Sequence, residues 1–128
     1  MYKFYYNNIL LFNMRIKKGL SIMSTLNCAD NTGARIIQII GVKNYRGRLG
    51  RLLRGGAGDI ILVISKKGKI HMRNKIHIAV IIRQKSSQKR DSGETFYFQD
   101  NAAVLLNKKM ELRGSKIYGP VSNECISR

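Results

Sequence analysis

Short apolar runs rich in β-branched residues set the limits on how this chain can fold. The strongest are ARIIQIIGV at 34–42, DIILVI at 59–64 and IHIAVIIR at 76–83, and weaker runs occupy 25–29, 95–98 and 102–106. Each has the length and residue preference of a strand and is bounded by Gly, Asn, Asp or Lys. The best helical candidate is a short segment after Gly119-Pro120. Closely spaced strands without crossover helices predict an all-β fold, either a small closed barrel or a sandwich.

The charge balance is strongly basic. The 128 residues include 24 Lys and Arg against 7 Asp and Glu, which gives a formal net charge of +17. The hydrophobic fraction of 44% is too high for a disordered basic tail, so we expect a packed core with a basic exterior. Like charges in such excess repel one another, and a bound polyanion relieves that repulsion. Nucleic acid is the usual polyanion, an anionic membrane is the other candidate, and a secreted cationic protein is the alternative without one.

The basic residues gather in four segments between or beyond the predicted strands: 43–54 (KNYRGRLGRLLR), 66–75 (KKGKIHMRNK), 83–90 (RQKSSQKR) and 108–116 (KKMELRGSK). Glycines among the arginines let the backbone approach a phosphate, and arginine binds phosphate through two parallel hydrogen bonds. The alternative is a set of solvated loops that only repel one another. The residues predicted to contact RNA are Lys43, Arg46, Arg48, Arg51, Arg54, Lys66, Lys67, Lys69, Arg73, Lys75, Arg83, Lys85, Lys89 and Arg90.

The first 14 residues, MYKFYYNNILLFNM, form an N-terminal extension ahead of a single domain predicted at 15–128. The apolar run at 9–12 is too short to cross a membrane. The segment lacks the apolar region and the cleavage site of a signal peptide. It is either an added arm or the product of a start assigned upstream of Met14, and the sequence leaves both open.

Neither a metal site nor a catalytic centre is predicted. Cys28 and Cys125 form no CxxC pair, so we expect two reduced thiols packed as small hydrophobes, with a single disulfide as the alternative. No carboxylate or cysteine cluster accompanies His71 or His77, and His77 is expected on the strand face opposite its neighbours. The carboxylates are dispersed, several of them at turns, whereas general acid–base chemistry needs two that converge.

An aromatic run at 95–98, TFYF, offers one further kind of RNA contact. By strand alternation Phe96 and Phe98 share one face and Tyr97 takes the other. An aromatic ring on a strand can stack on an unpaired base, as in barrels that bind single strands. Core packing is the interpretation preferred for the two phenylalanines.

Several ordered motifs resemble the universal L-fourteen family of large-subunit ribosomal proteins, called L-twenty-three in older eukaryotic nomenclature. NCADNTGA at 27–34 looks like its opening strand and turn. AVII at 79–82, a nine-residue gap, then SG at 92–93, Phe98, Asn101 and VL at 104–105 is similar to its most diagnostic stretch. GSKI at 114–117, GPV at 119–121 and Glu124 resemble its closing segment. The resemblance covers about residues 15–125, and RI at 15–16, GL at 19–20 and NC at 27–28 look more like the eukaryotic and archaeal form than the bacterial one.

The resemblance implies a small closed five-stranded barrel with a β-ribbon and a short helical C-terminal segment. It implies a structural constituent of the cytoplasmic large ribosomal subunit, without cofactor, membrane or small-molecule substrate, that binds large-subunit rRNA and contributes to an intersubunit bridge. Implied partners are ribosomal proteins of the L-three and L-twenty-four-e type, small-subunit rRNA across the bridge, and the anti-association initiation factor. The candidates for intersubunit and protein contacts are Lys108, Lys109, Arg113, Lys116, Tyr118 and Glu124.

Two departures from the family pattern stand out. The residues before Met14 match no part of it, and the chain stops at Arg128 where eukaryotic relatives continue with a longer helix, so we expect a reduced factor-docking surface. Two alternatives stay open from the residues alone. One is a free, chaperone-like RNA-binding barrel, which the cationic loops would serve equally well. The other is an enzyme acting on RNA, which would need a convergent acid–base or metal site.

Overall fold

The strands of the computed structural model follow the apolar runs of the sequence. The structure describes residues 17–43, 47–90 and 92–126, so the predicted N-terminal extension at 1–14 lies outside the described residues. The elements in chain order are β1 (Leu20–Ser21), β2 (Thr25–Cys28), β3 (Ala34–Val42), β4 (Arg54–Gly55), β5 (Ile60–Gly68), β6 (Ile76–Arg83), β7 (Gln88–Lys89), β8 (Thr95–Phe96), β9 (Ala102–Leu106) and α1 (Asn123–Ile126).

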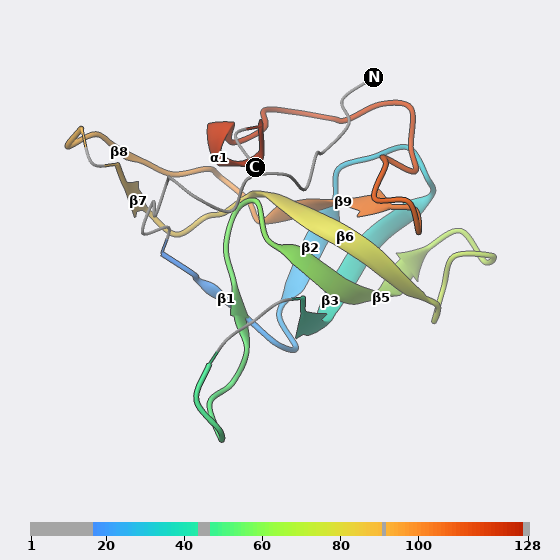
Figure 1. The fold of residues 1–128 in the computed structure, drawn as a ribbon. Helices are drawn as coiled ribbons and strands as arrows, with labels where there is room; N and C mark the ends of the chain where they lie inside the picture. Colours follow the sequence, from blue (N-terminus) through green and yellow to red (C-terminus); the bar gives the residue numbers. More distant parts are fainter. Residues whose placement is uncertain (1–16, 44–46, 91, 127–128) are drawn as a thin grey trace.

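Five strands close into a barrel in the order β2-β3-β5-β6-β9 (Figure 1). Four of the neighbouring pairs run antiparallel, and the parallel pair β2–β9 closes the barrel through Asn27↔Ala102 and Cys28↔Ala103. Closure pairs the backbone of every barrel strand on both sides, which removes the exposed edges that apolar strands would otherwise present. The prediction of an all-β, five-stranded closed barrel with a short C-terminal helix is confirmed.

The boundaries of three strands, β3, β6 and β9, coincide with the predicted runs at 34–42, 76–83 and 102–106. β5 differs, because it continues to Gly68 and so carries Lys66 and Lys67, which the sequence placed in a connection. Their backbone still finds a partner strand at the start of β3, where Ile36 pairs with Lys67. β8 is shorter than the predicted run at 95–98 and pairs only with β7, in a ribbon outside the barrel.

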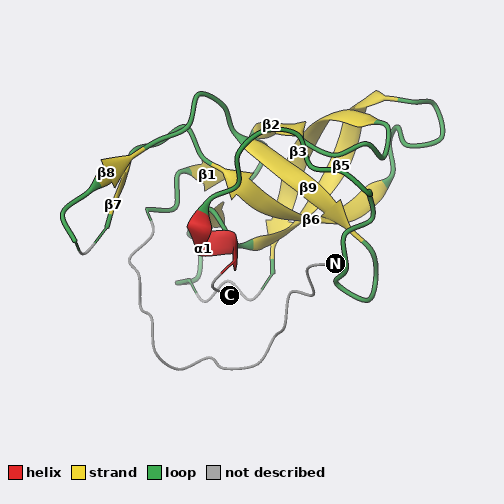
Figure 2. Ribbon diagram, turned by 90° about the horizontal axis from the view of Figure 1, so that it is seen from above, coloured by secondary structure: helices red, strands yellow, loops and turns green. Residues whose placement is uncertain are grey.

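Two apolar clusters fill the two sides of the barrel wall. The barrel interior takes alternate residues of the strands, among them the fully buried Ile37, Ile61 and Ile81. The intervening residues of β6 and β9, such as Val80 and Val104, form a second cluster with the segment that follows β9. This segment ends in α1, which lies against β6 (Figure 2) and places Cys125 Sγ 3.2 Å from Ile81 O. Each fully buried Ile or Leu side chain contributes roughly 1.5–3 kcal/mol, so both clusters matter to stability.

Both cysteines are free, as expected. Cys28 lies at the end of β2, where its Sγ donates to Asp30 Oδ1 at 3.0 Å. Burial and the contact with Asp30 raise the pKa of the Cys28 thiol to about 12, so it stays protonated at neutral pH. Cys125 is buried in the second apolar cluster. The Cys28 thiol is therefore not poised as a nucleophile or a metal ligand, since both chemistries need the thiolate.

The end of β5 passes very close to the turn before β3. Gly68 has a φ of +149°, and a Cβ added there would lie 2.5 Å from Gly33 O. Only glycine fits, because the backbone conformation and the contact both exclude a side chain.

Replacing Gly68 by alanine should therefore destabilise the protein by roughly 3 kcal/mol or more, since the backbone strain alone costs about 1–3 kcal/mol and the overlap adds to it. Gly50→Ala is the matched control: its φ is +81° but a Cβ there meets nothing within 4 Å. We expect the control to lose only about 1–2 kcal/mol. Urea unfolding measures both, and equal losses would contradict the packing argument.

Candidate nucleic-acid interface

The connection between β3 and β4 projects from the barrel as a basic loop (Figure 1). Its ends are fixed: Lys43 N donates to Ile60 O at 2.9 Å, and Arg54 lies in β4, which pairs with β1. Near its tip, Arg51 N donates to Arg48 O at 3.2 Å in a tight turn. The side chains of Lys43, Arg48, Arg51 and Arg54 are all exposed, whereas Arg46 lies outside the described residues. The loop therefore exposes basic side chains at the surface while backbone hydrogen bonds hold both of its ends in place.

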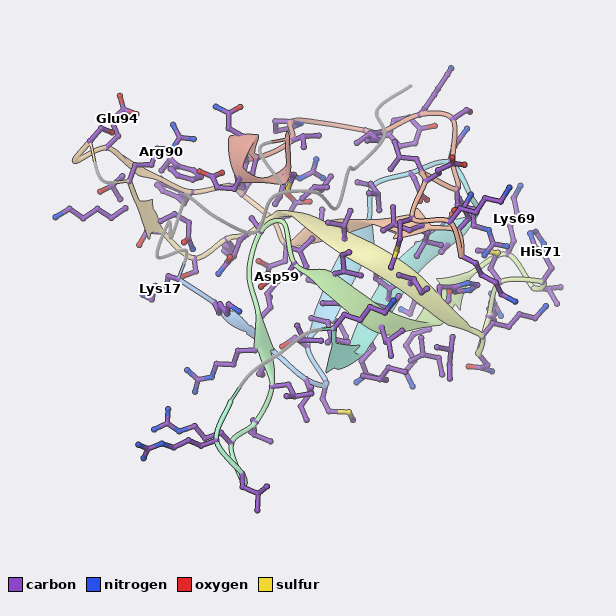
Figure 3. The ribbon with its side chains drawn as sticks, in the orientation of Figure 1. Lys17, Asp59, Lys69, His71, Arg90 and Glu94 are labelled. Carbon is purple, nitrogen blue, oxygen red and sulfur yellow. The ribbon has the colours of Figure 1, made fainter. Side chains whose placement is uncertain are left out.

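The connection between β5 and β6 is a second basic loop, and a buried side chain anchors it. Met72 is only 1% exposed and packs in the barrel cluster. Lys69 N donates to Gly33 O at 3.0 Å, and Asn74 N donates to Ser65 O at 2.8 Å. These bonds hold the predicted RNA-contacting residues of the loop on the surface, where they are exposed: Lys66, Lys67, Lys69, Arg73 and Lys75. Figure 3 places Lys69 and His71 at the opposite end of the view from Arg90 and Glu94.

Arg83 has a different environment from the other basic residues, because it is buried with 8% exposure. Its Nε donates to Asp100 Oδ1 at 3.1 Å, and its Nη1 donates to Tyr118 O at 2.7 Å and Pro120 O at 3.0 Å. The guanidinium thus ties the end of β6 to the C-terminal segment. Its donors face the protein rather than a phosphate.

Arg90 is half-buried and joins the β7–β8 ribbon to α1. Its guanidinium carbon lies 4.3 Å from the centroid of the Phe96 ring, and its Nε pairs with Glu124 Oε1 at 3.3 Å. Glu124 is itself buried and accepts a hydrogen bond from Ser122 Oγ. The predicted contact residues Arg90 and Glu124 therefore bind each other, while Lys85 and Lys89 nearby are exposed.

The segment between β9 and α1 presents the remaining candidates. Lys108, Lys109, Arg113, Lys116 and Tyr118 are all exposed. Hydrogen bonds from backbone amides to two asparagine side chains fix the conformation of this segment. Asn107 Oδ1 accepts from the backbone amides of residues 109 and 111, and Asn31 Oδ1 accepts from those of residues 115 and 116. The segment is thus a defined surface rather than a loose tail.

The sequence did not foresee the contact between Arg113 and His77. His77 lies on the face opposite Ile76, as expected, but it is His77 that is buried and Ile76 that is exposed. Burial lowers the pKa of His77, as does the charge of Arg113, whose Nη1 lies 3.0 Å from His77 Nδ1. No local signal predicts this pair, because the two residues are 36 positions apart.

The carboxylates are largely used inside the protein. Asp30 accepts from Thr32 and from Leu105 N, and Asp59 accepts from Gly56 N and pairs with Lys18. Across residues 17–43, 47–90 and 92–126, ion pairs between side chains take their cations from Lys18, Arg83 and Arg90. The described lysines and arginines of the two loops therefore have no carboxylate partner among residues 17–43, 47–90 and 92–126.

Other chemistries find little support in the part of the chain that the structure describes. There, no group of three or more His, Cys, Asp or Glu side chains is arranged to hold a metal ion. None of the described helices is long and apolar enough to span a bilayer.

Removing the Arg83 guanidinium should leave Asp100 and two carbonyl oxygens without their donor. We expect Arg83→Met to lose about 2–4 kcal/mol, less than a fully buried pair because the Asp100 side chain is 38% exposed. Lys85→Met, two residues along and exposed, should change stability by less than about 0.5 kcal/mol. Urea unfolding of both variants measures the difference, and a negligible loss for Arg83→Met would contradict a structural role.

The Arg90–Glu124 pair predicts a pH dependence. Burial alone raises the pKa of Glu124, but the hydrogen bond from Ser122 and the pair with Arg90 outweigh burial and hold the pKa below its usual 4.5. The ionised carboxylate therefore stabilises the fold above pH 4.5, and this contribution is lost as the pH falls through the lower folded-state pKa. The stability gap between wild type and Glu124→Gln should be largest at neutral pH and shrink as the pH falls below 4.5. A gap independent of pH in urea titrations would disprove this.

Comparison with protein families agrees with this geometry. The model of the family described as Ribosomal protein L14p/L23e matches residues 19–128, almost the whole chain and all of its strands. The match covers both basic loops, the ribbon and the C-terminal segment, and it leaves out the N-terminal extension. The chain therefore belongs to the L14p/L23e family of ribosomal proteins.

Proposed function

We propose that this chain binds large-subunit rRNA directly, within the structural role in the large ribosomal subunit that its family membership supports. The observation that carries the proposal is the pair of basic loops, 43–54 and 66–75, whose described lysines and arginines are exposed and form no ion pair with a described carboxylate. Because each root is hydrogen-bonded to the barrel, little conformational freedom is lost on binding.

The loops would recognise folded RNA by its shape. Exposed arginines such as Arg48 and Arg51 suit bidentate contacts with phosphate oxygens, and lysines such as Lys66 and Lys67 add point charges along the backbone. In double-stranded RNA the deep major groove hides the base edges, so phosphates and 2′-hydroxyls are the accessible groups. Arg83 is left out of the contact set because its donors bind protein oxygens.

The C-terminal segment would form a second surface, at the face that meets the small subunit. Its exposed Lys108, Lys109, Arg113, Lys116 and Tyr118 suit a bridge with small-subunit rRNA. Buried Glu124 would act there through Arg90 rather than by direct contact. Ribosomal proteins of the L-three and L-twenty-four-e type, and the anti-association initiation factor, are the protein partners proposed for the cytoplasmic ribosome. No catalytic step is assigned to the chain.

The salt dependence of binding tests the loop contacts. If about 8 phosphates are neutralised, the affinity for deproteinised large-subunit rRNA should fall with a log–log slope of about −6 to −7. Replacing Arg48, Arg51 and Arg54 together by alanine should flatten the slope by about 2–3, because each lost phosphate contact removes about 0.7–0.9. Filter binding over a range of salt concentrations measures both slopes.

Lys108→Ala with Lys109→Ala is the control, since these lysines belong to the surface proposed to face the small subunit. The control should leave the slope unchanged. A near-flat slope for the wild type would refute phosphate binding, and an equal effect of the control would refute the assignment to the loop.

A further inference from the structure

The β7–β8 ribbon extends away from the barrel (Figures 1 and 2) and has two chemically different faces. Gln88 pairs with Phe96 and Lys89 pairs with Thr95, so each of these pairs lies on its own face of the ribbon. Gln88 is buried and Phe96 half-buried, whereas Lys89 and Thr95 are exposed. We call the side of Gln88 and Phe96 the inner face and the side of Lys89 and Thr95 the outer face.

The inner face is occupied by contacts within the protein. The rings of Phe96 and Phe98 meet edge to face with centroids 6.1 Å apart, and Arg90 lies over Phe96. The two phenylalanines thus pack on each other, and Phe96 also packs on Arg90, whereas neither belongs to the two apolar clusters of the core, where the sequence had placed them. At the base of the ribbon, the side-chain amide of Gln88 binds the main chain of Lys17: its Oε1 accepts from Lys17 N at 2.7 Å, and its Nε2 donates to Lys17 O at 3.1 Å. These contacts hold the ribbon in one position.

The outer face combines a free aromatic ring with positive charge. Tyr97 is 70% exposed and directly follows β8. Its neighbours Phe96 and Phe98 are both half-buried and in ring contact with each other, so we infer from strand alternation that the Tyr97 ring lies on the outer face with Thr95 and Lys89. Glu94 pairs with Arg90 at 3.5 Å near the tip of the ribbon (Figure 3), so its negative charge is paired with the arginine that lies over Phe96. A large exposed ring costs free energy in water, and the phosphate-attracting Lys89 lies on the same face.

From this arrangement we propose that Tyr97 stacks on an unpaired base of the large-subunit rRNA while Lys89 binds the phosphate backbone beside it. Every base has a π-face, so the contact reads an unstacked nucleotide rather than a particular sequence. The fixed inner face matters because a ring held in place pays little conformational entropy on binding. The proposal rests on the proposed rRNA binding and adds a site separate from the two basic loops.

The test compares the affinities of Tyr97→Ala, Tyr97→Phe, Lys89→Ala and Met23→Ala for deproteinised large-subunit rRNA. Tyr97→Ala should weaken binding at least about fivefold, the lower range for one base–aromatic stack, with an unchanged salt slope. Tyr97→Phe keeps the ring and should stay within about twofold of wild type. Lys89→Ala should flatten the slope by about 0.7–0.9. Met23→Ala removes a 65% exposed apolar side chain outside the ribbon and both basic loops, and should have no effect.

Photo-crosslinking identifies the occupant of the outer face. A photoreactive phenylalanine analogue at position 97, in assembled large subunits, should crosslink to an rRNA base. Crosslinking to a ribosomal protein would overturn the proposal in favour of a protein contact. If the wild type binds rRNA with a steep salt dependence and Tyr97→Ala has the same affinity, the proposed base stack is wrong, whereas the proposed loop contacts are not contradicted. Absence of rRNA binding by the wild type would overturn both.

Discussion

Closure of the barrel between β2 and β9 is the constraint on which the rest of the structure depends. These strands come from opposite ends of the described chain and run parallel, so no tight turn can bring them together. Asp30 reinforces the junction from the end of β2: its Oδ2 accepts from Leu105 N in β9 at 2.8 Å, and its Oδ1 accepts from Thr32 N and Oγ1. With the barrel closed, the roots of both basic loops are fixed in space.

The placement of the carboxylates explains why the surface of the protein is so strongly positive. Several carboxylates bind groups within the protein. Asp30 accepts a hydrogen bond at the barrel junction, Asp100 forms an ion pair with Arg83, and Glu124 forms one with Arg90. Two of the predicted RNA-contacting arginines are thereby drawn into structural pairs. The loop cations receive no such partners among the described residues, so the charge that remains at the surface is concentrated where the loops project. Self-repulsion between these loops is the physical reason to expect a polyanionic partner.

Much of the fold follows from local pattern, because strands such as 34–42 and 76–83 keep a strand period and end at turn residues. The two-residue strands β1 and β4 could not be predicted, since each exists only through its pairing with the other, which is distant in the chain. The burial of Arg83 could not be predicted for the same reason. Its charge favoured a position at the surface, but it is buried by hydrogen-bond partners that lie 17 to 37 residues away in the chain. The number of barrel strands came from the family resemblance, as periodicity alone allowed a sandwich. The exposed loop cations follow directly from composition, because runs of like charge without carboxylates cannot be buried.

The proposed binding of folded RNA by the two basic loops makes one direct structural prediction. A density map of large ribosomal subunits containing this chain would locate every loop at once. Our account predicts that the side chains of segments 43–54 and 66–75 lie within hydrogen-bonding distance of rRNA phosphates, with the barrel unchanged. A map in which both loops face solvent, or contact only protein, would contradict it.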